Sequence, residues 1–223
     1  MPCPNVILSY PKSSRNWTTY LVNRLAPQHT FGGYHGNIVS FWRDFEQKCE
    51  NLICVIRNYK ECITIYSIKD NDLDITDKEI VWQSFMSELK GQNAMERGFD
   101  STDYISNIKL YDQTNKNKYL IYYEDLIANP EIELLKIADF LKTCQQDDAE
   151  IKAKKILENY NYHKQICLNE YKNRLYTNGD PNKLLFHSAK LNKEIKIKLD
   201  NYIAINWPKL WDKYLKRYKD EEI

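Results

Sequence analysis

The chain of 223 residues lacks long apolar runs and lacks an excess of either charge. No stretch approaches the ~18 to 20 consecutive apolar residues of a membrane-spanning helix, and the opening residues MPCPNVILSY show no positive segment ahead of an apolar one. Lys and Arg number 32 against 31 Asp and Glu, which excludes the broad cationic field used in non-specific nucleic-acid binding. We therefore expect one cytoplasmic domain over residues 1–223, without a membrane or nucleic-acid partner.

Paired cysteines and glycines are also scarce. The six cysteines form no C-x-x-C pair, so neither a zinc knuckle nor a redox pair is predicted, and we expect reduced thiols. Only 6 residues are glycine, and the phosphate-binding loop G-x-x-x-x-G-K-[ST] of ordinary kinases is absent. No carboxylate cluster suited to magnesium accompanies the basic segments, and we expect no metal.

Apolar runs typical of buried strands alternate with segments of helical periodicity. The predicted strands are residues 5–10, 52–56 and 119–123, and the predicted helices cover residues 17–25, 76–90 and 130–141. Thr76 to Glu79 matches a capping box, Asn129 is the expected cap before Pro130, and residues 31–36 are predicted to be a loop. From about Glu150 onward the chain is Lys-rich and predicted to be helical. This order predicts an α/β fold with a mainly parallel sheet flanked by helices, and a ligand site at the carboxyl ends of the strands.

The segment between the first predicted strand and the first helix carries groups that bind anions. It runs from Tyr10 to Trp17 as Y-P-K-S-S-R-N-W. Free backbone N–H groups and the positive end of the helix dipole meet there, and Lys12 adds a point charge. A phosphate is the predicted guest, and a charged turn that binds nothing is the alternative for this loop alone.

This loop resembles the Y-P-K-S-G-T-T-W loop of the sulfotransferases that use 3'-phosphoadenylyl sulfate (PAPS), in particular the cytosolic ones. The matching residues are Tyr10, Pro11, Lys12, Ser13 and Trp17, and the differing ones are Ser14, Arg15 and Asn16. The resemblance implies a P-loop-like fold of three layers in which Lys12 to Trp17 hold the 5'-phosphate of the donor. Ser14 places a Cβ where the family has glycine, and Arg15 offers a second charged donor.

Three later segments resemble the same family. Val55 to Glu61 is similar to the strand that ends in R-N-P-x-[DE], which implies that Arg57 grips the 3'-phosphate through its fork of donors. The family's serine partner falls on Ile65, with Thr64 and Ser67 as candidate replacements. A surface salt bridge is the alternative for Arg57.

The remaining two segments resemble the base-binding and 3'-phosphate regions of the family. Tyr122 to Leu126 is similar to its Y-E-D-L segment, which implies that Tyr123 and Trp17 enclose the adenine, with Tyr162 as a later aromatic contact; plain core packing is the alternative. Arg174 to Asp180 is similar to R-K-G-x-x-G-D, with Leu175 and Tyr176 differing, and makes Arg174 a second candidate for the 3'-phosphate.

The resemblance implies transfer of a sulfuryl group from PAPS to a phenol, alcohol or amine of small size, leaving adenosine 3',5'-bisphosphate (PAP). Lys12 would stabilise the leaving phosphate, Ser13 would orient the Lys12 ammonium, and His35 would act as general base. Two other functions stay open: a nucleotide-binding protein of the same fold that has lost turnover, and a P-loop kinase of a small metabolite. Residues 82–111 would supply acceptor-pocket walls or ordinary core, and a monomer and a homodimer are equally compatible with the C-terminal residues.

Overall fold

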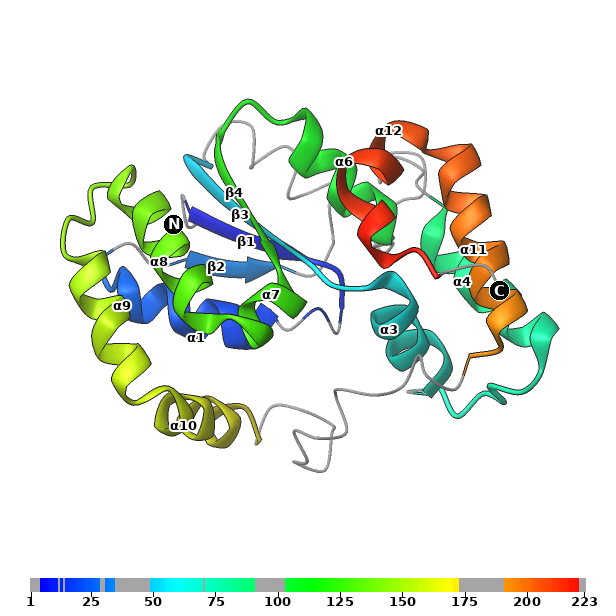
Figure 1. Cartoon of the computed structure of the whole chain (residues 1–223), viewed down its shortest axis with the longest axis horizontal. Helices are drawn as coiled ribbons and strands as arrows, with labels where there is room; N and C mark the ends of the chain where they lie inside the picture. Colours follow the sequence, from blue (N-terminus) through cyan, green and yellow to red (C-terminus); the bar gives the residue numbers. More distant parts are fainter. Residues whose placement is uncertain are drawn as a thin grey trace.

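The computed structural model describes residues 5–11, 13, 15–28, 31–34, 49–69, 71–90, 103–172 and 191–220. Its centre is a four-stranded sheet in the order β2-β1-β3-β4 (Figure 1), and every neighbouring pair is parallel. The strands are β1 (Asn5–Ser9), β2 (Phe31–Tyr34), β3 (Asn51–Ile56) and β4 (Asn117–Tyr122). The predicted α/β fold with a parallel sheet is therefore confirmed.

Helices cover both faces of this sheet because alternate strand residues point to opposite sides. Ile7, Ile53, Val55 and Ile121 share one apolar cluster with α1 (Arg15–Leu25), α7 (Tyr123–Ala128), α8 (Pro130–Lys142), α9 (Ala149–Glu158) and α10 (Tyr160–Lys172). In Figure 1 these helices lie to the left of the sheet and below it.

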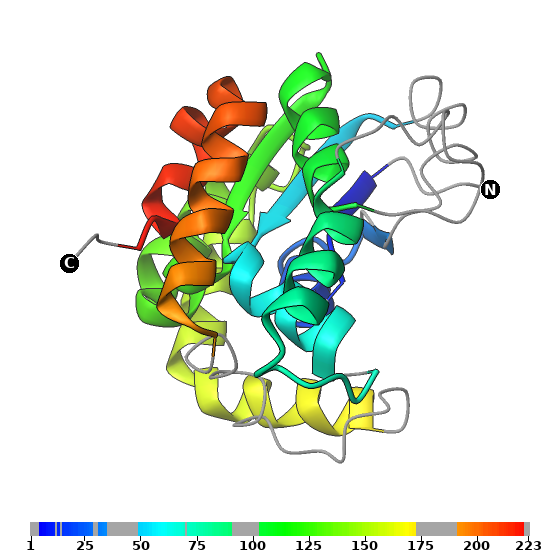
Figure 2. The same cartoon turned by 90° about the vertical axis from the view of Figure 1, so that its right-hand side faces the viewer.

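The opposite face packs against the helices from the middle and the end of the chain, which stand in front of the sheet in Figure 2. They are α3 (Tyr59–Ile63) with its π-helical continuation Thr64–Lys69, α4 (Lys78–Leu89), α6 (Tyr104–Gln113), α11 (Lys193–Asn206), α12 (Pro208–Leu210), a π-helical turn Trp211–Leu215 and a 3-10 turn Lys216–Tyr218. Val6, Leu8, Leu52 and Cys54 supply the strand side of this cluster. Two cores thus enclose the sheet.

The edge strand β2 corrects the sequence prediction, which made residues 31–36 a loop. Its sequence FGGY has little strand propensity, yet Gly32 pairs with Val6 and Tyr34 with Leu8. Asn23 of α1 holds the start of the strand: its Oδ1 accepts from the Phe31 N–H at 2.8 Å, and its Nδ2 donates to the Phe31 carbonyl at 3.3 Å. The extended conformation of β2 is therefore set by its pairing with the buried strand β1, because the sequence FGGY does not by itself favour a strand.

The start of α4 is one residue away from the predicted capping box. Asp77, and not Thr76, is the N-cap: its carboxylate accepts from the backbone N–H of Glu79 at 2.9 Å and of Ile80 at 3.1 Å. Thr76 instead donates its hydroxyl to Asp74 at 2.7 Å. A carboxylate that accepts two helix donors stabilises the first turn more than a single hydroxyl does.

The five cysteines that the structure describes are buried and take part in no disulfide there: Cys49, Cys54, Cys62, Cys144 and Cys167. Over the described ranges, no helix combines the length and the apolar character that spanning a bilayer requires.

Candidate active site

The segments that follow β1, β3 and β4 meet at one edge of the sheet, because parallel strands end on the same side. Ser9 at the end of β1 pairs with Val55, and Ile56 at the end of β3 pairs with Tyr122. The turn before α1, Arg57 after β3 and Tyr123 after β4 therefore lie at adjacent strand ends.

The turn between β1 and α1 has the features of an anion site. The Ser13 N–H donates to the Tyr10 carbonyl at 3.2 Å, and α1 begins at Arg15 with no acidic residue in its first turn. The Ser13 hydroxyl is buried and interacts with the Cys62 thiol of α3. A buried hydroxyl beside a helix start without negative charge suits a phosphate. Lys12 and Ser14 lie outside the described residues.

Arg57 is a buried cation at the end of β3, with 2% of its surface exposed. Its guanidinium carbon lies 5.0 Å from the centre of the Tyr123 ring, and its Nη2 lies 3.6 Å from Glu61 Oε2. Its carbonyl accepts a hydrogen bond from the Tyr104 hydroxyl at 2.7 Å. A surface salt bridge has both side chains in contact with solvent. Because the Arg57 side chain is buried, the interpretation of Arg57 as a surface salt bridge is wrong.

The Cys62 thiol of α3 is influenced both by Arg57 and by the turn between β1 and α1. Burial raises the pKa of this thiol to about 12, and the charge of Arg57 and a hydrogen bond with the Ser13 hydroxyl lower it in part. The fold thus brings together one predicted contact of the 5'-phosphate and the predicted contact of the 3'-phosphate.

The predicted aromatic residues differ in their surroundings. Trp17 and Tyr123 are each 9% exposed. Trp17 stacks on Tyr20 with ring centres 5.6 Å apart, and the Tyr160 ring meets Trp17 edge-on at 5.6 Å. Tyr162 is 65% exposed, so the residue of its segment that contacts Trp17 is Tyr160, two positions earlier.

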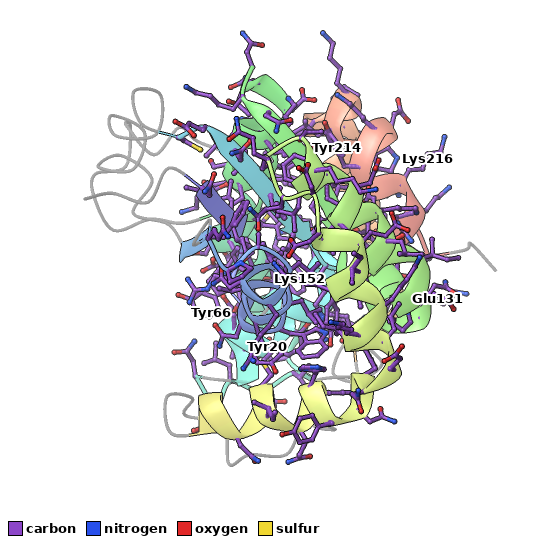
Figure 3. The ribbon with its side chains drawn as sticks, turned by 90° about the vertical axis from the view of Figure 1, so that its left-hand side faces the viewer. Tyr20, Tyr66, Glu131, Lys152, Tyr214 and Lys216 are labelled. Atoms are coloured by element: carbon purple, nitrogen blue, oxygen red, sulfur yellow. The ribbon has the colours of Figure 1, made fainter. Side chains whose placement is uncertain are left out.

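Helix α10 packs against α1, and its Tyr160 meets Trp17 near the start of α1. The Tyr20 hydroxyl and His163 Nδ1 are 2.9 Å apart, and Figure 3 shows Tyr20 between the two helices. The Arg24 guanidinium lies 4.9 Å from the Tyr20 ring centre. Residues two positions apart lie on different sides of a helix, so Tyr160 and Tyr162 do not both face α1. The sequence spacing alone did not show that Tyr160 is the residue that faces it.

The two candidate hydroxyls beyond Arg57 lie in the π-helical segment that continues α3. Thr64 is 1% exposed, and its hydroxyl has no hydrogen-bond partner among the described residues. Ser67 is 9% exposed, and its carbonyl accepts from Asn71 at 3.0 Å. Ile65, at the position of the family serine, is 3% exposed and belongs to the buried apolar residues. Of these two candidates, Thr64 has the more deeply buried side chain.

Two residues of the site escaped the sequence analysis. Glu124 Oε1 accepts from the Asn58 N–H at 2.9 Å and so ties the turn after β3 to the turn after β4. Lys60, 2% exposed, lies in the first turn of α3. Glu124 stands inside the Y-E-D segment and could have been found there, whereas nothing near Lys60 in the sequence indicates its buried partners. His35 and Arg174 lie outside the described residues.

Metal ligands are not gathered at this edge in the described part of the chain. Over these ranges no group of three or more His, Cys, Asp or Glu side chains is placed to hold a metal ion. The described groups that could contact an anion include the Arg15 and Arg57 side chains, the Ser13 and Thr64 hydroxyls and the backbone at the start of α1.

A parallel sheet covered by helices on both faces, with a tight turn from its first strand into its first helix, is the architecture of P-loop-like α/β proteins. The family model for the sulfotransferase domain matches residues 34–178, well over half of the chain. The chain therefore belongs to the sulfotransferase family, whose members transfer sulfuryl groups. The matched range contains Arg57, Tyr123 and Arg174, and the turn before α1 precedes it. Comparison with curated proteins gives no match.

Proposed function

We propose that the chain, as one domain over residues 1–223, transfers a sulfuryl group from PAPS to a hydroxyl or amine of a small-molecule acceptor. The observation that supports this most is the position of Arg57, which is buried beside Tyr123 at the end of β3, next to the turn after β1. Phosphate contacts at two adjacent strand ends, with an aromatic residue beside one of them, suit an adenosine that carries phosphates at both its 3' and 5' positions.

The residues present fit that donor. In this proposal the 5'-phosphate binds Lys12, Ser13, Ser14, Arg15, Asn16 and Trp17. The 3'-phosphate binds Arg57 and Arg174, with Thr64 or Ser67 adding a hydroxyl. The adenine lies against Trp17 and Tyr123, with Tyr162 as the further aromatic candidate and Tyr160 as the neighbour that fixes Trp17. The buried hydroxyl of Thr64 supports this assignment, because it has no hydrogen-bond partner among the described residues.

The donor supplies a sulfuryl group joined to a phosphate that is a good leaving group. The acceptor oxygen or nitrogen forms its bond to sulfur as the bond between sulfur and the bridging oxygen breaks, and the 5'-phosphate of PAP leaves with that electron pair. Lys12 stabilises the charge that builds on the leaving oxygen, with Ser13 orienting its ammonium. His35 accepts the acceptor's proton as general base. No metal is required in this scheme.

Nucleotide titration of wild type and an Arg57→Lys variant tests the donor site. Lysine keeps the charge but loses the fork of donors, so we expect binding of PAP to weaken about 10- to 100-fold, the equivalent of one or two charge-assisted hydrogen bonds. Binding of adenosine 5'-phosphate, which lacks the 3'-phosphate, should change little. Arg24→Lys is the matched control, because Arg24 also lies over a tyrosine ring but is exposed on α1.

Three results of this titration would count against the proposal. They are equal losses for both nucleotides in Arg57→Lys, tighter binding of ATP with magnesium than of PAP, and an effect of Arg24→Lys as large as that of Arg57→Lys. Tighter ATP binding would favour the kinase of a small metabolite.

Turnover is measured in the same preparations with a sulfate-labelled donor and a panel of phenols, alcohols and amines. Lys12→Ala should reduce transfer by about a hundredfold or more while the protein stays folded, since it removes a preorganised charge from the transition state. PAP binding by wild type without transfer to any acceptor would identify a nucleotide-binding protein that has lost turnover.

A further inference from the structure

Glu124 bridges the turn after β3 to the last residues of the described chain. Its Oε1 accepts from the Asn58 N–H at 2.9 Å, and its Oε2 accepts from the Tyr218 hydroxyl at 2.8 Å. Asn58 directly follows Arg57, and Glu124 directly follows Tyr123. The backbone neighbours of the two proposed donor contacts are thus joined by one carboxylate.

Lys60 attaches the same C-terminal residues to the start of α3. Its ammonium donates to the Tyr218 carbonyl at 2.6 Å, and it lies 2.5 Å from Asp220 Oδ2 and 2.7 Å from Asp200 Oδ1. The Asp220 N–H donates to Asp200 Oδ2 at 2.8 Å, and the Tyr59 hydroxyl also donates to Asp200. Lys60 and Asp200 are each 2% exposed. Three residues after Arg57, the chain is therefore held by a buried cluster of charges.

A third attachment lies at the surface beside the end of β4. The Arg217 guanidinium donates to both carboxylate oxygens of Asp125, at 2.9 and 2.5 Å, and its central carbon lies 4.1 Å from the centre of the Tyr122 ring. Residues 217–220, here called the C-terminal clasp, therefore contact both strand ends that carry the proposed donor site.

The positions of these contacts have a consequence for the donor site. A catalytic or binding side chain works only when its supporting contacts fix it to within about 0.5 Å, and Arg57 depends on a turn whose next N–H is held by Glu124. The clasp belongs to the far end of the chain, 94 residues from Glu124 and 158 from Lys60. Detachment of the clasp would break the contacts of Tyr218 with Glu124 and with Lys60 at the same time.

We propose that Glu124 is a positioning residue for the donor site, and that docking of the C-terminal clasp and binding of the bisphosphate nucleotide strengthen each other. This inference rests on the proposed function, because the coupled ligand is its donor or product. By linkage, nucleotide binding stabilises the docked clasp by the same factor that the docked clasp adds to nucleotide affinity.

The first test compares three variants in their affinity for PAP. Glu124→Ala should weaken binding about tenfold or more, because the Asn58 N–H and the Tyr218 hydroxyl both lose their acceptor. Glu124→Gln should bind nearly as wild type does, since its amide oxygen accepts from Asn58 and its amide nitrogen donates to the Tyr218 oxygen. Tyr218→Phe removes only the hydrogen bond between the clasp and Glu124, so its affinity should fall between those of the two Glu124 variants.

The second test measures amide hydrogen exchange and needs no activity. In the protein without nucleotide, exchange of residues 57–60 should be faster in Glu124→Ala and Tyr218→Phe than in wild type. Added PAP should slow exchange over residues 217–220 in wild type and do so much less in Glu124→Ala. Lys213→Met is the control: it breaks the ion pair with Asp112 of α6, which anchors the C-terminal turns away from the strand ends.

The two readouts separate this inference from the proposed function. If wild type binds no PAP, the proposed function fails, and faster exchange of residues 57–60 in Glu124→Ala still supports the positioning role. Unchanged exchange and affinity in Glu124→Ala would overturn the inference. So would equal losses in Glu124→Ala and Glu124→Gln, or an equal loss in Lys213→Met.

Discussion

Arg57 and Lys60 lie three residues apart in the sequence, and the fold uses their charges for different purposes. Arg57 lies beside Tyr123 at the strand end, whereas Lys60 is surrounded by Asp200, Asp220 and the Tyr218 carbonyl. A lysine with three oxygen partners is a structural cation, because its charge is already neutralised where it is buried. The sequence motif identified Arg57 and could not assign Lys60, whose partners come from the other end of the chain.

His163 makes the contact between α1 and α10 sensitive to pH. Burial lowers the pKa of His163 below its usual value, and the Arg24 guanidinium lowers it further. Below a pH of about 6.5 the unfolded chain then takes up this proton more readily than the folded one, so the contribution of His163 to stability is present above that pH and is lost on acidification.

Replacing His163 with glutamine checks this sign. Between pH 7.5 and 5.5 the free energy of unfolding from urea titrations should fall more in wild type than in His163→Gln, which keeps a polar partner for Tyr20. The acidic residues titrate in both proteins and cancel in the comparison. A steeper fall in His163→Gln than in wild type would show that the sign is wrong.

Among the elements, the sheet owes its register to a line of asparagines at the amino ends of three strands. Asn5, Asn51 and Asn117 are paired in the ladder. Asn51 Nδ2 donates to Asn5 Oδ1 at 2.7 Å, and Asn117 Nδ2 donates to Asn51 Oδ1 at 2.7 Å. A slip by one residue would move these amides to the opposite face and break both bonds, so the pairs select one register.

Asn51→Ala tests the asparagine line. We expect it to lower the free energy of unfolding by about 1–3 kcal/mol, because it leaves the buried Asn5 amide without its donor. Asn206→Ala is the control, since its side chain donates to the Tyr202 carbonyl at an exposed position, and it should change stability by less than about 0.5 kcal/mol. Equal effects of the two substitutions in urea unfolding would contradict a role for the line.

The elements also show how far local pattern carries. Strands β1, β3 and β4 and helices α1, α4 and α8 were predicted from apolar runs and helical spacing, and the structure confirms them within a few residues. Strand β2 was missed, because its glycines carry no pattern and its conformation comes from β1 and Asn23. Helix α3 and its π-helical continuation were not predicted either; their buried residues Tyr59, Cys62, Ile63 and Ile68 pack into the apolar cluster on the other face of the sheet.

For the whole molecule, the Lys60 cluster joins the end of the chain to its centre. Lys60 belongs to the strand-end region, Asp200 to α11 and Asp220 to the last described residues. In Figure 1 this places the C-terminal helices against α3, on one side of the sheet. The attachment is buried, so its loss would leave carboxylates without their cation inside the protein.

Lys60→Met should therefore lower the free energy of unfolding by about 3–5 kcal/mol, the usual cost of removing one partner of a buried ion pair. Lys78→Met is the matched control: Lys78 and Glu194 form an exposed pair at 2.6 Å that also reaches α11, and its loss should cost about 0–1 kcal/mol. In the double variant Lys60→Met with Asp200→Asn, the total loss should be smaller than the sum of the single losses. Additive losses would show that the two side chains do not interact.

Residues near one another in the chain determined much of this protein from the sequence alone: the alternation of strands and helices, the parallel sheet, and the basic turns that the family uses. These features depend on periodicity and local chemistry, which operate over a few residues. Tertiary structure alone decided that β2 completes the sheet, that Tyr160 and not Tyr162 contacts Trp17, and that Glu124 and Lys60 hold the C-terminal clasp. Each of these depends on segments far apart in the chain, and the geometry that brings them together follows from burying both faces of the sheet at once.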